Sequence, residues 1–231
     1  AAGLRAHLVA GLPKRGEKVC AAVVRPVDLP PSANLLIEKL DVRDPAQWDA
    51  LVENLVAAWG GLDVLMNVAG VLRVGYLQEQ TADDVDFHFD INTKGVIFGT
   101  QTAARQMLKQ GRGHIINVAS LAGITPVPGI SLYSASKFAV RGFSLAAAME
   151  LRSKGIKVTV VCPDAVQTPM LDIQKDKEQA ALTFSGPRAL TTEEVVTAIL
   201  GRGLRDAPIE IMLPASRGWI SKFASAFPAL T

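Results

Sequence analysis

Cysteine, charge of one sign and long apolar runs are all scarce in this sequence, and each scarcity excludes a class of protein. The two cysteines, Cys20 and Cys162, lie inside apolar or β-branched runs. This placement argues against a disulfide framework and favours reduced thiols in the cytoplasm. The 24 Lys and Arg residues and the 22 Asp and Glu residues are interspersed and leave a net charge of +2. Without a basic run, no nucleic-acid partner is expected.

The sequence also lacks the patterns of a membrane span, a signal peptide or a metal site. Its apolar stretches stay well short of about 18 residues, and its first residues do not resemble a secretory signal, so we expect a soluble protein. The three histidines, His7, His88 and His114, lack the spacing of metal ligands. We expect them to be ordinary surface or partly buried side chains, and we expect no metal.

What the sequence does contain is enough apolar material for one α/β domain spanning 1–231, since 49% of its residues are hydrophobic. Predicted strands at 18–24, 35–42, 62–70, 114–120, 156–163 and 208–214 alternate with predicted helices at 1–15, 44–60, 81–110, 131–154 and 191–205. Near-continuous apolar strands separated by helices predict a doubly wound parallel sheet that is covered on both faces.

Tyr133 and Lys137 are the first candidate catalytic residues. They lie four residues apart on the predicted helix 131–154, so their side chains share one helix face. A phenol beside an ammonium group can transfer a proton, and the positive charge is expected to lower the pKa of the phenol toward neutral pH. The spacing alone is common on amphipathic helices, so other residues must support this interpretation.

Ligands of parallel sheets bind outside the carboxyl ends of the strands, and polar residues gather there in this sequence. The segment NVAG at 67–70 ends one predicted strand, Ser120 ends another, and PDAVQT at 163–168 ends a third. Asn92 lies inside the predicted helix 81–110. An amide close to a glycine is a poor choice for helix stability, so stability alone does not explain this residue. A loop of suitable length brings Ser120 back toward Tyr133.

Together these residues resemble the short-chain dehydrogenase/reductase family over almost the whole chain, which implies a Rossmann-type fold. The family's catalytic tetrad matches Asn92, Ser120, Tyr133 and Lys137. Its strand-end motifs match NVAG and PDAVQT, with Val68 in place of an Asn and Asp164 in place of a Gly. The resemblance implies an oxidoreductase that transfers a hydride between a nicotinamide cofactor and a small alcohol or ketone.

The resemblance also implies which residues contact the cofactor, namely Asp41, Val42, Asn67, Ala69, Gly70, Tyr133, Lys137, Pro163, Val166 and Thr168. A carboxylate at the end of the second strand would hold the ribose 2′-hydroxyl of NAD, whereas an arginine there accompanies NADP. The strand 18–24 is followed by Arg25, with no carboxylate before Asp28. We therefore expect NADP(H), with Arg25 near the 2′-phosphate and NAD(H) as the alternative.

The tetrad has a physical rationale and several alternatives. Tyr133 would supply the proton when a ketone is reduced, Ser120 would stabilise the developing alkoxide, and the family role of Asn92 is to hold a water that relays protons to Lys137. A loop cap at Ser120 and a helix-kinking amide at Asn92 remain alternatives. At the level of the whole protein, the alternatives are a catalytically inactive cofactor-binding regulator or scaffold and a flavodoxin-like binding module. The latter leaves the Ser, Tyr and Lys set unexplained.

Three further segments carry expectations. The chain begins within the helix that normally follows the family's first strand and Gly-rich turn, so we expect about 12–15 further residues upstream. Segment 164–190 is predicted to be a substrate loop, in which Asp164 either weakens cofactor binding or faces solvent. The tail 215–231 carries an apolar stripe at helical spacing, which favours packing on its own domain or on another subunit of a homodimer or homotetramer.

Overall fold

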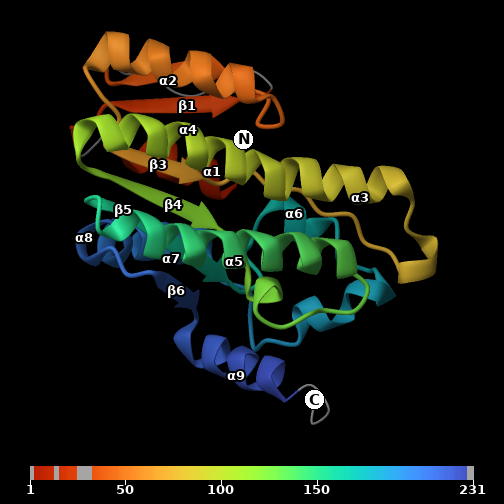
Figure 1. The fold of residues 1–231 in the computed structure, drawn as a ribbon. Coiled ribbons are helices and arrows are strands. Elements are labelled where there is room, and N and C mark those ends of the chain that lie inside the picture. Colours follow the sequence, from red (N-terminus) through yellow and green to blue (C-terminus); the bar gives the residue numbers. More distant parts are fainter. Residues whose placement is uncertain (1–2, 13–15, 25–32, 228–231) are drawn as a thin grey trace.

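The computed structural model describes residues 3–12, 16–24 and 33–227, in which helices and strands alternate as predicted (Figure 1). The strands are β1 (Val19–Val23), β2 (Leu35–Lys39), β3 (Val64–Asn67), β4 (Gly113–Val118), β5 (Ile156–Pro163) and β6 (Glu210–Leu213). The α-helices are α1 (Leu4–Gly11), α2 (Pro45–Trp59), α3 (Ala82–His88), α4 (Gly95–Gln110), α5 (Ser131–Arg152), α6 (Pro169–Asp172), α7 (Thr192–Ala198), α8 (Leu204–Asp206) and α9 (Ala215–Ala226). Short 3₁₀ turns cover Leu77–Glu79, Leu121–Gly123 and Glu178–Phe184, and π-helical turns cover Phe89–Lys94 and Ile199–Gly203.

The sheet is parallel throughout and is covered on both faces, which confirms the predicted fold class. Strands β3, β4, β5 and β6 pair in that order, and β1 pairs with β2. Helices α4 and α5 lie on one face (Figure 1). Along β4, Ile115 packs toward these helices, whereas Ile116 packs with residues of α1 and α7 on the other face. The alternation follows from the two-residue period of a strand, which turns successive side chains to opposite faces.

The facing edges of β1 and β3 are separate in the described part of the chain. A cavity of about 590 Å³ lies here, lined by residues 19–22 of β1 and 64–67 of β3. Among the described residues no strand pairs with both edges, which divides the sheet into two parts. The expectation of further upstream residues stays a prediction.

The predicted helix 81–110 is interrupted by one π-helical stretch. Its start is capped as expected, because the Thr81 side chain accepts a hydrogen bond from the backbone N–H of Asp84 while the Asp84 carboxylate accepts one from the N–H of Thr81. The helix then widens over Phe89–Lys94, a segment that contains Asn92, before α4 continues. Such π-turns commonly accompany functional sites, and here the wider turn lies where Asn92 projects toward the loop after β3.

Helix α9 leaves its apolar stripe largely uncovered. Trp219, Ile220 and Phe223 are 60–66% exposed, so packing of this stripe on its own domain is not what the structure shows. Within the described residues, no helix combines the length and apolar character that crossing a membrane requires.

Candidate active site

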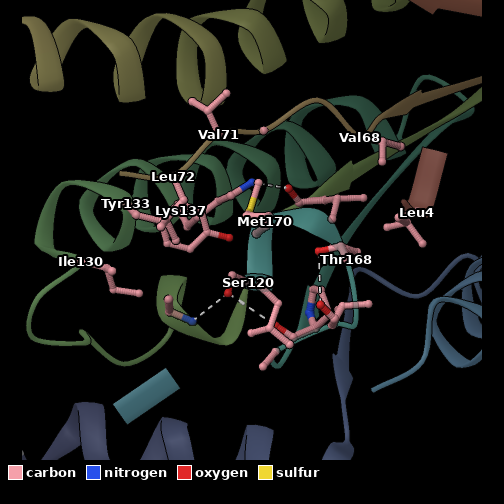
Figure 2. A pocket seen from close by; sticks show the side chains of 18 of the residues that line it. Leu4, Val68, Val71, Leu72, Ser120, Ile130, Tyr133, Lys137, Thr168 and Met170 are labelled. Atoms are coloured by element: carbon pink, nitrogen blue, oxygen red, sulfur yellow. Dashed lines mark hydrogen bonds between the residues drawn. The ribbon is translucent and has the colours of Figure 1, made fainter. Parts of the chain in front are cut away.

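A cavity of about 990 Å³ opens at the carboxyl ends of the strands, where ligands of parallel sheets bind (Figure 2). Most of the predicted site residues line it. These are Asp41, Val42, Ala69, Gly70, Ser120, Tyr133, Lys137, Pro163, Val166 and Thr168. The structure therefore brings together residues from four strand ends and from α5. Arg25 lies outside the described residues.

Tyr133 and Ser120 form the polar centre of this cavity. Tyr133 lies in the first turn of α5, and Ser120 follows β4. The Ser120 hydroxyl accepts a hydrogen bond from the N–H of Ala122 and donates one to the carbonyl of Pro163 at 3.4 Å. Ser120 is therefore a cap of the short turn that follows it and also part of the cavity wall. The cap alternative is what the structure shows, and the role of Ser120 toward a developing alkoxide stays a prediction.

The pKa of Tyr133 differs from the expectation based on its spacing from Lys137. Burial raises the pKa of the Tyr133 phenol to about 12, and a hydrogen bond with Ser120 opposes this rise only in part. The net shift is therefore opposite in direction to the lowering toward neutral pH that the spacing of Tyr133 and Lys137 predicted. Burial removes the solvent that would otherwise stabilise the phenolate.

Lys137 is buried in the cavity wall, and its amine is bonded to the end of β4. Its Nζ atom donates a hydrogen bond to the carbonyl of Val118 at 3.0 Å and lies 5.7 Å from the ring centroid of Tyr133. Burial lowers the pKa of Lys137 to about 8. An ideal Cβ placed on Gly70 would lie 3.5 Å from this Nζ atom, an ordinary van der Waals contact, so Gly70 lies directly beside the amine.

Asn92 is fully buried and clamps the loop that follows β3. Its Oδ1 atom accepts a hydrogen bond from the N–H of Val71 at 2.8 Å, and its Nδ2 atom donates to the carbonyl of Val71 at 3.0 Å. The same Nδ2 atom donates to the hydroxyl of Ser136. The Asn92 side chain is therefore an amide bonded to backbone, which was the alternative to a catalytic role. The water-relay role of Asn92 stays a prediction.

Asn67 faces the interior of the sheet instead of the larger cavity. Its Nδ2 atom donates to the side-chain oxygen of Asn117 at 2.9 Å and contacts Thr100 on α4, and Asn117 in turn donates to Ser144 on α5. This network joins β3 and β4 to the two helices in front of them. Asn67 is therefore a buried polar side chain whose hydrogen bonds are satisfied within the protein. Its contact with a cofactor stays a prediction.

At the other end of the cavity, Asp41 and Val42 follow β2. The Asp41 carboxylate pairs with Arg43 at 2.6 Å, and this hydrogen bond lowers the pKa of Asp41. Arg43 also lines the cavity, which the sequence did not indicate. The backbone carbonyl of Val42 accepts a hydrogen bond from the indole of Trp48, so α2 fixes this turn.

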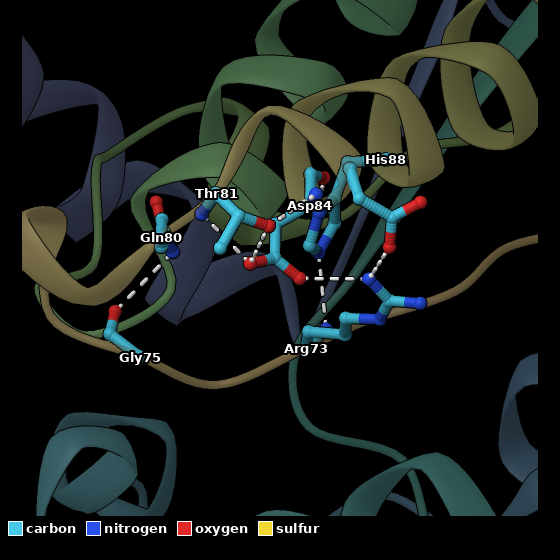
Figure 3. Close-up of polar contacts among 7 residues, drawn as sticks. Arg73, Gly75, Gln80, Thr81, Asp84 and His88 are labelled. Carbon is cyan, nitrogen blue, oxygen red and sulfur yellow. Dashed lines mark hydrogen bonds and ion pairs between the residues drawn. The ribbon is translucent and has the colours of Figure 1, made fainter.

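His88 is bonded to the loop that follows β3, whereas an ordinary surface or partly buried histidine was expected (Figure 3). It is fully buried, and burial lowers its pKa. One ring nitrogen, Nε2, accepts a hydrogen bond from the backbone N–H of Arg73 at 3.0 Å, while Nδ1 lies 2.7 Å from the carbonyl of Asp84. Arg73 also pairs with Asp83 and Asp84. His88 and Asn92 thus hold the loop on either side of Leu72, a buried residue that lines the cavity.

His114 is also more buried than expected. It is 7% exposed, its Nε2 atom lies 2.9 Å from the hydroxyl of Thr159 on β5, and burial lowers its pKa to about 4. This histidine belongs to the core of the sheet. No cluster of three or more His, Cys, Asp or Glu side chains that would hold a metal occurs in the described ranges.

Segment 164–190 forms part of the cavity wall. Its two ends meet where Val166 pairs with Leu190 as an isolated β-bridge. Met170, Leu171 and Leu182 line the cavity, whereas Ile173 and Phe184 are exposed. Asp164 does not face solvent, because it lines the cavity and forms an ion pair with Arg217 of α9, and its expected effect on cofactor binding stays a prediction.

The parallel sheet and the cavity at its carboxyl edge define a doubly wound α/β protein with a cavity where ligands of such sheets bind. A family model described as short chain dehydrogenase matches residues 1–179, and the chain belongs to that family. This membership confirms the resemblance found in the sequence.

Relatives of known name show the same family. The chain is 41% identical over 144 residues to a 3-alpha-(or 20-beta)-hydroxysteroid dehydrogenase of Mycobacterium tuberculosis, covering 62% of this chain and 55% of the relative. It is 36% identical over 165 residues to a cyclopentanol dehydrogenase of Comamonas testosteroni, covering 70% and 66%. These matches therefore span roughly half to two thirds of the relatives' length. A solved structure of serine dehydrogenase complexed with NADP+ is 28% identical, with a TM-score of 0.78 over 91% of this chain and 90% of the other.

Proposed function

We propose that this protein interconverts an alcohol and a carbonyl compound, with hydride transfer to or from a nicotinamide cofactor. The observation that carries the proposal is the meeting of Ser120, Tyr133 and Lys137 in one large cavity at the strand ends. Membership of the short-chain dehydrogenase family supports the same reaction class. The alternative, an inactive cofactor-binding regulator or scaffold, does not explain why Ser120, Tyr133 and Lys137 meet in one cavity.

The shape and lining of the cavity fit a dinucleotide. The cavity extends from Gly3 and Leu4, at the N-terminus of α1, past Asp41 and Val42 to the Tyr133 side. A helix N-terminus presents free N–H groups that favour phosphate, and Asp41 would face the adenine end. Its volume lies at the upper end of the usual range for such sites, about 300–1,000 Å³. When bound, the nicotinamide would supply or accept the hydride.

The chain's own residues divide the remaining work. Tyr133 is protonated at neutral pH and lies in the cavity wall, where it would donate its proton to a carbonyl oxygen. Ser120 would donate a hydrogen bond to the same oxygen as negative charge develops on it. Lys137 would hold the ribose hydroxyls, and its positive charge would favour the phenolate that remains after proton transfer. Ala69, Gly70, Pro163, Val166 and Thr168 would form the wall behind the cofactor.

We also propose a preference for NADP(H). The described residues at the end of β1 include Ala22 and Val24, which line the cavity and carry no carboxylate to bind a ribose 2′-hydroxyl. Arg43, 55% exposed beside Asp41, offers a second cation for a 2′-phosphate. These observations support the choice, as does the NADP+ in the serine dehydrogenase structure.

A homodimer or homotetramer is proposed as the working form. The exposed Trp219, Ile220 and Phe223 of α9 support it, because an apolar stripe of this kind is stabilised when a second subunit covers it. Light scattering of the wild-type chain and of a Trp219→Ser, Phe223→Ser variant tests this proposal. A monomeric mass for the wild type at micromolar concentration would contradict it.

The proposed reaction is tested by the absorbance of reduced nicotinamide with a panel of ketones that includes cyclopentanone. We expect ketone-dependent loss of NADPH absorbance that is abolished by boiling the protein. NADPH binding by fluorescence, without turnover of any ketone or alcohol in the panel, would instead support the inactive regulator.

A further inference from the structure

Asp164 and Arg217 form an ion pair in the wall of the cavity. Asp164 follows Pro163, whose carbonyl accepts the hydrogen bond of Ser120, so the pair begins one residue from the polar centre of the site. The Asp164 side chain is 15% exposed and the Arg217 side chain 30% exposed. Both residues line the cavity. Because the two charges cancel, this part of the wall presents no unbalanced charge to a ligand.

The same pair supports a third segment. The Nη2 atom of Arg217 donates a hydrogen bond to the hydroxyl of Ser185 at 3.3 Å. At Gly186, an ideal Cβ would lie 3.4 Å from both the guanidinium carbon of Arg217 and the Oδ2 atom of Asp164. The chain at Ser185 and Gly186 therefore rests directly on the ion pair. Ser185 and the neighbouring Leu182 line the cavity, so their position sets its width.

Helix α9 has a second ionic tether that offers a matched comparison. Lys222 pairs with Glu210 of β6 at 2.5 Å, with side chains 32% and 12% exposed. The two tethers are thus similarly buried and both attach α9 to the sheet. Neither Lys222 nor Glu210 lines the larger cavity. Loss of the Lys222 tether should loosen α9 without widening the cavity.

We propose that the Asp164–Arg217 pair is a specificity-determining element of the substrate site. It holds Ser185 and Gly186, together with the first turn of α9, against the end of β5, and so limits the size of the carbonyl compound that reaches Tyr133. The proposal rests on the proposed function for its substrate class. It favours compact, uncharged ketones, because the pair holds Ser185 and Gly186 in the wall and its charges cancel. Asp164 stands where the matching family motif has a glycine, and its carboxylate is the anion of this ion pair.

The first test requires no activity. Hydrogen–deuterium exchange of the segment 178–186 is compared for the wild type, Arg217→Met, Asp164→Asn and Lys222→Met. We expect about tenfold faster exchange in the Arg217 and Asp164 variants, and exchange within about twofold of wild type for Lys222→Met. The double variant D164N/R217M should exchange no faster than the faster single variant, because the two residues act as one unit. Equal acceleration by Lys222→Met, or no acceleration by Arg217→Met, would overturn the proposal.

The second test measures specificity as the ratio of kcat/KM for cyclopentanone to that for the bicyclic ketone 2-decalone, with NADPH. Arg217→Met should lower this ratio by about fivefold or more, chiefly through KM, whereas Lys222→Met should leave it unchanged. An unchanged ratio in Arg217→Met would overturn the proposal even if exchange increased. A wild type that turns over neither ketone, nor any other carbonyl compound, would count against the proposed function, while the exchange result would still decide whether the pair holds 178–186.

Discussion

Lys137 donates its Nζ hydrogen bond to the carbonyl of Val118 at 3.0 Å, in a setting that lowers the pKa of the amine to about 8. The amine thus lies at the end of β4 and in the cavity wall, where its charge is costly in the folded chain without a cofactor. This cost fits the proposed role of Lys137 in holding the ribose hydroxyls. The hydroxyl groups of a bound ligand would accept the hydrogen bonds that solvent no longer accepts from the buried amine.

Replacing Lys137 with Met is expected to stabilise the cofactor-free protein at pH 7 while abolishing activity. A pKa of about 8 in place of 10.5 costs the folded state about 3 kcal/mol. Loss of the bond to Val118 offsets about 1 kcal/mol. We therefore expect the free energy of unfolding to rise by about 2 kcal/mol, measured by urea unfolding.

The pH dependence of this difference provides the control. Below pH 8 both the folded and the unfolded chain carry the charge, so the cost is fully present. Between about pH 8 and 10.5 the unfolded chain binds the proton and the folded chain does not, so the wild type gains stability as pH rises. The advantage of Lys137→Met should therefore shrink between pH 8 and 10. A constant difference would contradict the lowered pKa.

Replacing Tyr133 with Phe removes only the transferable proton. We expect turnover to fall by about two to four powers of ten, with NADPH affinity within about threefold of wild type. Steady-state kinetics and fluorescence titration measure the two quantities. Retention of more than about half of the wild-type turnover would show that Tyr133 is not the acid.

Replacing His88 with Leu should loosen the loop around Leu72. The change leaves the N–H of Arg73 without its buried partner, which costs about 1–3 kcal/mol of stability. We expect KM for a ketone to rise more than kcat falls, because His88 positions the cavity wall and does not contact the reacting atoms. His7→Leu is the control, since His7 is 40% exposed and does not line the cavity. Equal effects of the two variants on KM would argue against a positioning role.

The preference for NADPH over NADH is expected to depend on the residues at the end of β1. We expect kcat/KM with NADPH to exceed that with NADH by about tenfold or more, because the described residues there offer no carboxylate to a ribose 2′-hydroxyl. Arg43→Ala should reduce the preference if this residue contacts the 2′-phosphate. A tenfold preference for NADH would be the opposite of what the proposal requires.

Much of the fold followed from the sequence because its signals are local and periodic. The apolar strand 114–120 and the helix beginning near Tyr133 were both predicted close to their observed bounds. In a parallel sheet all carboxyl ends meet at one edge, so the convergence of Ser120, Gly70 and Thr168 on one cavity could be inferred without coordinates.

The rest depended on contacts between distant segments. The pairing of Asp164 with Arg217 joins positions 53 residues apart, and no local pattern marks either residue as a partner of the other. The sequence around His88 is that of a surface helix residue, and its burial depends on the loop at Arg73, which lies over it in the structure. The pKa of Tyr133 was predicted in the wrong direction because the spacing to Lys137 does not reveal burial, which is the main cause of the upward shift.

The most direct test of the central claim is the fate of an isotopic label. The protein is incubated with cyclopentanone and NADPH that carries deuterium at the transferable position of the nicotinamide, and the alcohol is analysed by mass spectrometry. The account predicts that the wild type yields cyclopentanol bearing one deuterium on the carbinol carbon, and that Tyr133→Phe yields almost none in the same time. If the wild type binds the cofactor but transfers no label to this or any other carbonyl compound, the account is contradicted.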